Sequence, residues 1–246
     1  VDLVRVPGEL RADRLDSDVG FYTGGQHALS LTGESVLVGN YAGEDLTTGN
    51  RNAFVGYYAG EDVTTGNDNS FFGYSAGSAN NLGSGNTFIG SRAGSSSGNA
   101  ISSTFVGQNA GMEATGSRNT FVGSLSGAAT TTGDRNAFFG NNSGSANTLG
   151  TNNTLIGSDA DVLGNTLRNA TAVGYRSAVG ADHSLVLGSI AGIRGCGDFG
   201  SFCESVNVGI GTTTPLSRLH IVGGADAGLA GAGYMVTGDV AALNVV

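Results

Sequence analysis

The chain has 246 residues, with 20 acidic side chains against 11 basic ones, so its formal net charge is −9 at pH 7. Every basic residue is an arginine, and no basic cluster stands out along the chain. This balance is unsuited to nucleic acid or to an anionic membrane surface, and no apolar run is long enough to span a bilayer. We therefore expect no nucleic-acid partner and no membrane insertion by this segment.

The sequence divides into three parts. Residues 1–32 are not repetitive, and we expect an N-terminal connecting or capping segment there. Residues 33–194 repeat a phrase of Asn, a small residue, two large apolar residues and Gly. The closing glycines, 14–17 residues apart, are Gly39, Gly56, Gly73, Gly90, Gly107, Gly123, Gly140, Gly157, Gly174 and Gly188. A period this short cannot bury a core alone, so each repeat must be one coil of a solenoid.

The phrase itself favours β-structure. Its apolar residues are β-branched or aromatic, and the residues between phrases are Gly, Asn, Asp and Ser, which form turns. No stretch has the 3.6-residue apolar period of a helix. The sequence therefore predicts an all-β fold, a parallel β-roll of about ten coils.

Two apolar columns run along the repeats. The first, two residues before the glycine, contains Phe54, Phe71, Phe88, Phe105, Phe121 and Phe138. The second, directly before it, contains Val55, Phe72, Ile89, Val106, Val122 and Phe139. Neighbouring strand residues point to opposite faces, so one column fills the coil and the other faces outward. An outward apolar ladder is best buried against other chains, and we expect core and interface residues here in a homotrimer. The alternative is a monomeric roll thick enough to bury both columns.

Residues 195–246 lose the period, and we expect a C-terminal β-rich transition segment there. Cys196 and Cys203 bracket a loop that contains two glycines. A close pair of this kind suits a disulfide in an oxidising compartment. Two free thiols and bridges between chains are the alternatives. No further Cys or His falls at the spacing of a zinc site.

Three segments resemble known fibre proteins. Residues 170–188 (ATAVGYRSAVGADHSLVLG) resemble the head repeats of trimeric autotransporter adhesins. The longer coils, such as residues 86–94 (NTFIGSRAG), are similar to repeats of bacterial surface fibres and phage tail fibres. Residues 206–222 (VNVGIGTTTPLSRLHIV) resemble a segment that such fibres carry before a C-terminal tip or chaperone domain. The resemblance implies a left-handed parallel β-roll assembled as a homotrimer.

Several motifs have both a functional and a structural interpretation. Ser75 lies in a Gly-x-Ser-x-Gly phrase, but a nucleophile elbow needs a strand–turn–helix context, and other coils carry Tyr58 or Arg92 in the same slot. We interpret this phrase as part of the repeat. The chain also lacks a Walker A or His-Glu-x-x-His motif, and the three histidines are far apart: His27, His183 and His220. We expect no enzyme activity, no catalytic residues and no cofactor.

Three recurring polar patterns are also open to interpretation. Four carboxylates share one place in consecutive coils: Glu44, Asp45, Glu61 and Asp62. Ca²⁺ favours such oxygen ligands, but the pattern stops after two coils, and we expect a solvated acidic edge without metal. Paired threonines raise the idea of an ice-binding array, but their column is interrupted. The recurring Asn is expected to cap a turn or to form an internal amide ladder.

These observations favour a structural shaft of an extracellular adhesive or receptor-binding fibre, at a bacterial cell surface or on a phage virion. A cell-surface receptor or glycan would then be bound through a C-terminal tip. The alternative is a glycan-binding module that uses grooves between the chains of the trimer. A polysaccharide-degrading solenoid would need paired carboxylates on a concave face, where the repeats have mostly Ser, Thr, Asn and Gly.

Overall fold

The computed structural model describes residues 20–23, 26–32, 34–189, 206–210, 212–216 and 219–221. Among these residues there are strands, turns and bends but no helix. They belong to two separate units, residues 20–189 and residues 206–221. Cys196 and Cys203, and with them the expected disulfide, lie outside the described residues.

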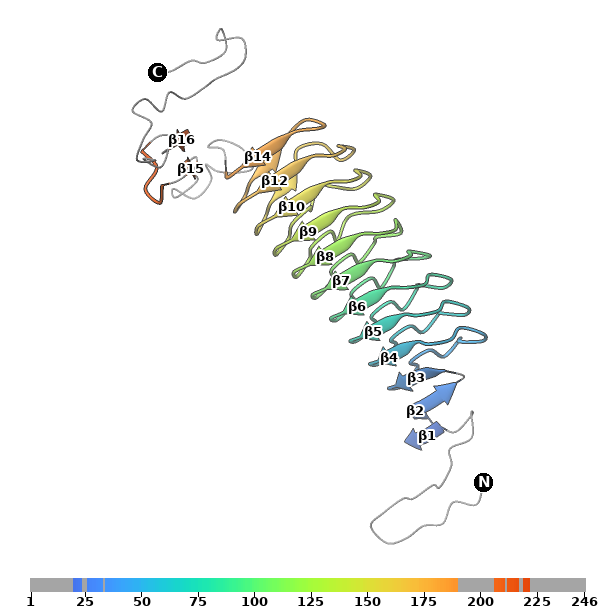
Figure 1. Ribbon diagram of the computed structural model, residues 1–246. Helices are drawn as coiled ribbons and strands as arrows, with labels where there is room; N and C mark the ends of the chain where they lie inside the picture. Colours follow the sequence, from blue (N-terminus) through green and yellow to red (C-terminus); the bar gives the residue numbers. More distant parts are fainter. Residues whose placement is uncertain are drawn as a thin grey trace, which may run out of the picture. The chain divides into compact units, whose positions relative to one another are not determined.

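The first unit is built on a 12-stranded sheet in which the strands follow one another in chain order (Figure 1). Its strands are β1 (Gly20–Thr23), β2 (Gln26–Thr32), β3 (Ser35–Val38), β4 (Ala53–Val55), β5 (Ser70–Phe72), β6 (Thr87–Ile89), β7 (Thr104–Val106), β8 (Thr120–Val122), β9 (Ala137–Phe139), β10 (Thr154–Ile156), β12 (Thr171–Val173) and β14 (Leu185–Leu187). β1 and β2 form an antiparallel hairpin that covers the free edge of β3. From β3 onward every pair is parallel, so ten strands are joined by nine turns of a solenoid. The predicted all-β parallel solenoid is confirmed.

The register places each residue of a coil beside its counterpart in the next coil. Phe54 pairs with Phe71, and Phe71 with Phe88. The six phenylalanines of the first column are completely buried, and their rings stack with centroids 4.6–5.0 Å apart and interplanar angles of 3–14°. The small residue three positions after each closing glycine, usually alanine, packs against this stack. The interior of the roll is thus one aromatic column with a thin wall of small side chains.

The interior changes in the last coils. The phenylalanine column ends at Phe138 and continues as Leu155 and Ala172. Where this column becomes smaller, a second, two-stranded parallel sheet begins, formed by β11 (Asp161–Val162) and β13 (Ala178–Val179). Val162 and Val179 are buried in the same core. Valines from a different wall therefore occupy the space that the missing aromatic rings leave.

The recurring asparagines form an internal amide ladder, one of the two roles that the sequence indicated. The Oδ1 atom of Asn69 accepts a hydrogen bond from the backbone N–H of Asn86 at 3.0 Å. The Nδ2 atom of Asn69 donates to the carbonyl oxygen of Gly83 at 2.8 Å. The same two bonds recur at Asn52, Asn86, Asn119, Asn136 and Asn153. Each side chain thus satisfies two buried backbone groups of the neighbouring coil.

The closing glycines are required by how closely the coils approach one another. Gly90 has a φ of +130°, which L side chains rarely adopt, and a Cβ atom there would lie 2.5 Å from the carbonyl oxygen of Gly107 in the next coil. Both constraints recur at most coils, because the same corner is stacked each time. This explains why the phrase ends in Gly.

The second unit is a small parallel pair formed by β15 (Val208–Ile210) and β16 (Leu219–Ile221). The side-chain Nδ2 of Asn207, directly before β15, donates at 3.3 Å to the carbonyl oxygen of Pro215, which lies between the two strands. The segment that resembles the transition region of fibre proteins therefore contains β-structure of its own.

Candidate functional site on the outer face of the sheet

The outer face of the parallel sheet carries the second apolar column. In each three-residue strand the central side chain points into the coil, and the first and third point outward. The third positions are occupied by Val55, Phe72, Ile89, Val106, Val122, Phe139, Ile156 and Val173. The first positions carry Ala, Ser or Thr. We refer to these two columns together as the outer face.

The outer apolar side chains are substantially open to solvent in the single chain. Phe72 is 40% exposed and Ile89 is 41% exposed. Phe139 and Ile156 are exposed to the same degree, and the valines are half-buried. The roll of a single chain therefore does not bury both apolar columns. The result is a continuous apolar strip along β4–β12. Single apolar residues scattered over a surface are common, but a contiguous strip of this kind marks an interaction surface.

The outer face has a longer pattern that the single-coil phrase conceals. Its third positions read Val, Phe, Ile, Val over β4–β7, and again Val, Phe, Ile, Val over β8–β10 and β12. Each member of the first set lies 67 residues before its counterpart, as Phe72 does before Phe139. Both outward phenylalanines follow a small first-position residue, Ser70 or Ala137. Four coils thus make one larger unit, present twice.

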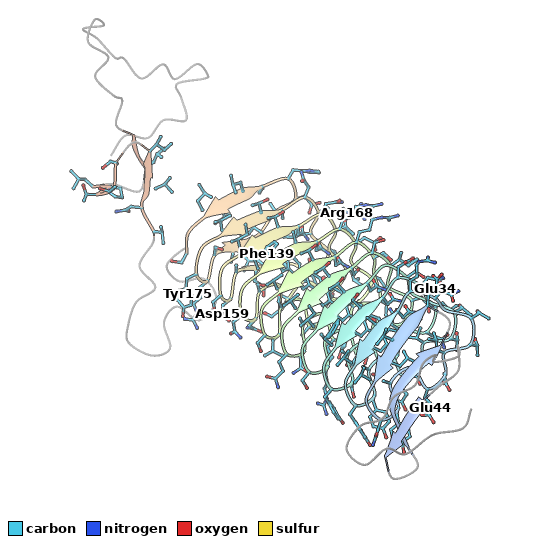
Figure 2. All side chains as sticks on the ribbon, turned by 60° about the horizontal axis from the view of Figure 1, so that its bottom comes forward. Glu34, Glu44, Phe139, Asp159, Arg168 and Tyr175 are labelled. Atoms are coloured by element: carbon cyan, nitrogen blue, oxygen red, sulfur yellow. The ribbon has the colours of Figure 1, made fainter. Side chains whose placement is uncertain are left out.

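Polar edges flank the outer face on both sides. In Figure 2, Phe139 lies on the sheet, Asp159 and Tyr175 at the edge where the strands end, and Arg168 and Glu34 along the opposite edge. On the edge that precedes the strands, Arg51 forms a bidentate ion pair with Asp68 of the next coil, with distances of 2.6 and 2.8 Å. Hydrogen bonding to the Arg51 guanidinium lowers the pKa of Asp68. The outer face is therefore an apolar centre with polar borders, which is the general composition of a protein–protein interface.

The structure does not assemble the catalytic motif considered for the sequence. Ser75 lies in a turn with φ of +51°, and its backbone N–H donates to the carbonyl oxygen of Tyr57 in the preceding coil. His183 contacts the side chain of Asn169 at 3.1 Å, near the other end of the solenoid. His27 lies in β2 and His220 in the second unit. Ser75 therefore occupies an ordinary repeat position.

The paired threonines serve the contacts between coils. The hydroxyl of Thr47 donates to the carbonyl oxygen of Thr64 at 2.9 Å, and the hydroxyl of Thr64 donates to Oδ1 of Asn81 at 2.8 Å. The column then continues with Gly98, which has no side chain. A regular threonine array of the kind that an ice surface would need is absent at this corner among residues 34–189.

The four carboxylates do lie near one another. Burial raises the pKa of Glu61, and the neighbouring charges of Asp62, Glu44 and Asp45 raise it further. Across the residues that the structure describes, no group of three His, Cys, Asp or Glu side chains is arranged to hold a metal ion. The carboxylates form an acidic edge.

Sequence reasoning missed a group of tyrosines beside this acidic edge. Tyr41, Tyr57, Tyr58 and Tyr74 are in mutual ring contact across three coils. Hydrogen bonding to Tyr57 and burial raise the pKa of Tyr58 to about 12, and the charge of Glu61 contributes. The signal was present in the sequence, because all four occupy the two positions after a closing glycine. It was overlooked because these positions vary from coil to coil.

Comparisons with protein-family profiles, with curated proteins and with solved structures found no match to this chain. Within the described part of the chain, no helix is long and apolar enough to cross a membrane.

Proposed function

We propose that this chain is the structural shaft of an extracellular adhesive or receptor-binding fibre, in which three copies bury their outer faces against one another. In this proposal each copy is a left-handed parallel β-roll, the role is structural and not catalytic, and the fibre belongs to a bacterial surface or a phage virion. The observation that carries the proposal is the apolar strip along β4–β12.

The physical argument starts from solvation. Burying apolar side chains is favourable by about 25 cal/mol per Å², and a single chain leaves one whole apolar column half in water. The exposed apolar column has one side chain per coil, so a surface that covers it must repeat with the same axial spacing. Another copy of the chain has that spacing because its sequence is the same. Copies related by rotation about an axis parallel to the solenoid bury the same face on every chain. The resemblance to trimeric fibre proteins favours three copies.

Fibre function follows from the same features. Each strand pairs with the next in register along nine turns, so the unit is stiffened along its length by backbone hydrogen bonds. The side chains of the coils are mostly small and polar outside the two apolar columns. A stiff and uniform body of this kind suits a shaft, and we place receptor or glycan recognition by a tip in or beyond the C-terminal segment.

The assembly can be tested on the outer face. One chain has a mass of 24.5 kDa, so we expect light scattering to give about three times this mass at micromolar concentration. Replacing Ile89 with Asp places a charge in the apolar strip, and we expect folded monomers, because an unpaired buried charge is strongly unfavourable in the assembly. Gln108→Asp is the matched control, because Gln108 is exposed at a corner outside the outer face; it should remain trimeric.

Two results would contradict the proposal. One is a monomeric wild-type chain at micromolar concentration. The other is an Ile89→Asp variant with unchanged mass and unchanged thermal stability, since the strip would then face water. A dimer of the wild-type chain would retain the interface but exclude three-fold symmetry. Saturable binding of glycans by trimers, and not by folded monomers, would favour the alternative module with grooves between chains.

A further inference from the structure

The four tyrosines beside the acidic edge form a compact exposed cluster, which we call the tyrosine corner: Tyr41, Tyr57, Tyr58 and Tyr74. Tyr41 stacks on Tyr58 with centroids 4.8 Å apart, and Tyr57 stacks on Tyr74 at 5.9 Å. Edge contacts of Tyr57 with Tyr41 and with Tyr58 join the two stacks. Tyr57 is 42% exposed and Tyr74 is 46% exposed. The corner thus presents aromatic surface to the solvent beside the outer face.

The fold does not require aromatic residues at this corner. Four coils later the chain carries Asn109, Ser124, Leu125 and Asn141 at the positions that correspond to Tyr41, Tyr57, Tyr58 and Tyr74. The backbone of that later corner is the same, since Leu125 and Tyr58 both have a φ of +60°. A left-handed conformation is uncommon for a bulky residue, and Tyr41 and Tyr58 both adopt it. The tyrosines therefore serve something other than coil formation.

The described side chains on the acidic side of the corner carry negative charge. Glu44, Asp45, Glu61 and Asp62 come from the same two coils; burial raises the pKa of Glu61, and repulsion by the other three carboxylates raises it further. In the part of the chain that is described, none of the four forms an ion pair with an arginine, whereas Arg51 pairs with Glu34 and Asp68 at another corner. Glu61 also acts electrostatically on Tyr58. A bound cation would relieve this repulsion, and a neutral sugar would not.

The chain itself places a cation on the corner. The guanidinium carbon of Arg92 lies 5.9 Å from the ring centroid of Tyr74, within the range of a cation–π contact. This contact occupies one end of the stacked rings. The acidic end, with Tyr41, Tyr57, Tyr58 and the four carboxylates, has no such contact among the described residues.

We propose that the tyrosine corner, together with the four adjacent carboxylates, binds arginine or lysine side chains of a basic segment in a partner protein. Aromatic rings and carboxylates are the two groups that attract guanidinium and ammonium ions. The site lies outside the apolar columns, so the proposal does not depend on how many copies of the chain assemble.

The test uses the full 246-residue chain and a capped peptide of alternating arginine and glycine, with binding measured by calorimetry. We expect saturable binding that weakens as the salt concentration rises. One variant, Tyr57→Ser, Tyr58→Leu and Tyr74→Asn, keeps every charge. A second, Glu61→Ala and Asp62→Ala, keeps every ring. Both introduce residues that the chain carries four coils later, so both should fold, and each should weaken binding by about tenfold or more.

A variant that gains a second site, in place of losing the first, cannot be explained by loss of folding. Ser124→Tyr, Leu125→Tyr, Asn141→Tyr, Ala128→Glu and Ala129→Asp should build a second corner, and the number of peptides bound per chain should rise from one to two. The proposal is overturned if the wild-type chain shows no saturable binding, if only one of the two loss variants binds more weakly, or if a neutral oligosaccharide binds more tightly than the peptide. A loss confined to the acidic variant would indicate general attraction by net charge.

Discussion

At the scale of single residues, the amide ladder accounts for the most regular polar feature of the sequence. A buried asparagine has a donor and an acceptor on one short side chain, which is what two backbone groups of a neighbouring coil require. Ser103 takes one place in the column, and its Oγ atom accepts the hydrogen bond from the backbone N–H of Asn119 at 3.2 Å. A serine can thus replace the acceptor in this column.

Asn86 offers a direct test of the ladder. Replacing it with Ala removes the partner of the Ser103 N–H and the shorter of two hydrogen bonds to the Ala100 carbonyl, which keeps only Asn80 Nδ2 at 3.4 Å. A buried group left unsatisfied costs about 1–3 kcal/mol. We expect Asn86→Ala to lower the free energy of unfolding by about 2–4 kcal/mol, measured by denaturant titration followed by circular dichroism. Asn86→Ser is the control and should lose about half as much, because the hydroxyl retains an acceptor. Equal stability of the Ala variant and the wild type would mean that water replaces the amide.

At the scale of the strand, the alternation of side chains separates core residues from outward-facing residues. The sequence predicts that both kinds are present but not which residue of each apolar pair is which. The structure places the aromatic column inside, so Phe88 and Phe105 lie in the core of the coil. The sequence groups both columns as core and interface residues without separating the two roles. A charge at Phe105 would therefore test folding and not assembly.

Neighbouring substitutions in β7 should separate these roles. Phe105→Ala removes a ring that stacks between Phe88 and Phe121, and truncation of a buried phenylalanine costs about 3–5 kcal/mol. We expect a correspondingly lower free energy of unfolding. Val106 is the next residue and lies on the outer face. To exclude effects on assembly, Val106→Ala is made in a chain that also carries Ile89→Asp, and there it should change the free energy of unfolding by less than about 1 kcal/mol. The reverse order of the two effects would show that the columns are exchanged.

The parts of the fold that could not be predicted from sequence lie where the phrase is interrupted. The coils around β11 and β13 carry Asp161 and Ala178 in the slot that other coils fill with Gly. The Asp161 carboxylate is buried and accepts hydrogen bonds from the Ser145 hydroxyl and from the backbone N–H groups of Ala146 and Val162. These partners lie up to 16 residues away, and the spacing of the phrase does not identify them. The tyrosine corner was missed for the same reason, because its contacts join variable positions of different coils.

At the scale of the whole solenoid, the unit of four coils makes a specific prediction about length. Deleting residues 57–123 joins Gly56 to Ser124 and removes one such unit without shifting any column. In a stacked array each coil contacts mainly its neighbours, so we expect the shortened chain to fold and to assemble, with a smaller hydrodynamic radius.

A deletion of residues 57–116 is the control for this experiment. It is close to the same length but joins Gly56 to Ser117, which places the next phrase out of phase with the preceding coil. We expect this variant to lose β-structure by circular dichroism or to aggregate. Equal folding of the two deletions would mean that the columns do not determine the register of the coils.

The duplicated outer face also has a consequence for how the length of the protein can evolve. Two matching units within one gene permit unequal recombination, and a crossover between equivalent positions, such as Phe72 and Phe139, adds or removes four coils at once. Every such product keeps the aromatic stack, the amide ladder and the Val, Phe, Ile, Val order of the outer face. Descendants that differ in length by whole units would then keep the same pattern on the outer face, so selection can change the length of the solenoid without changing that surface.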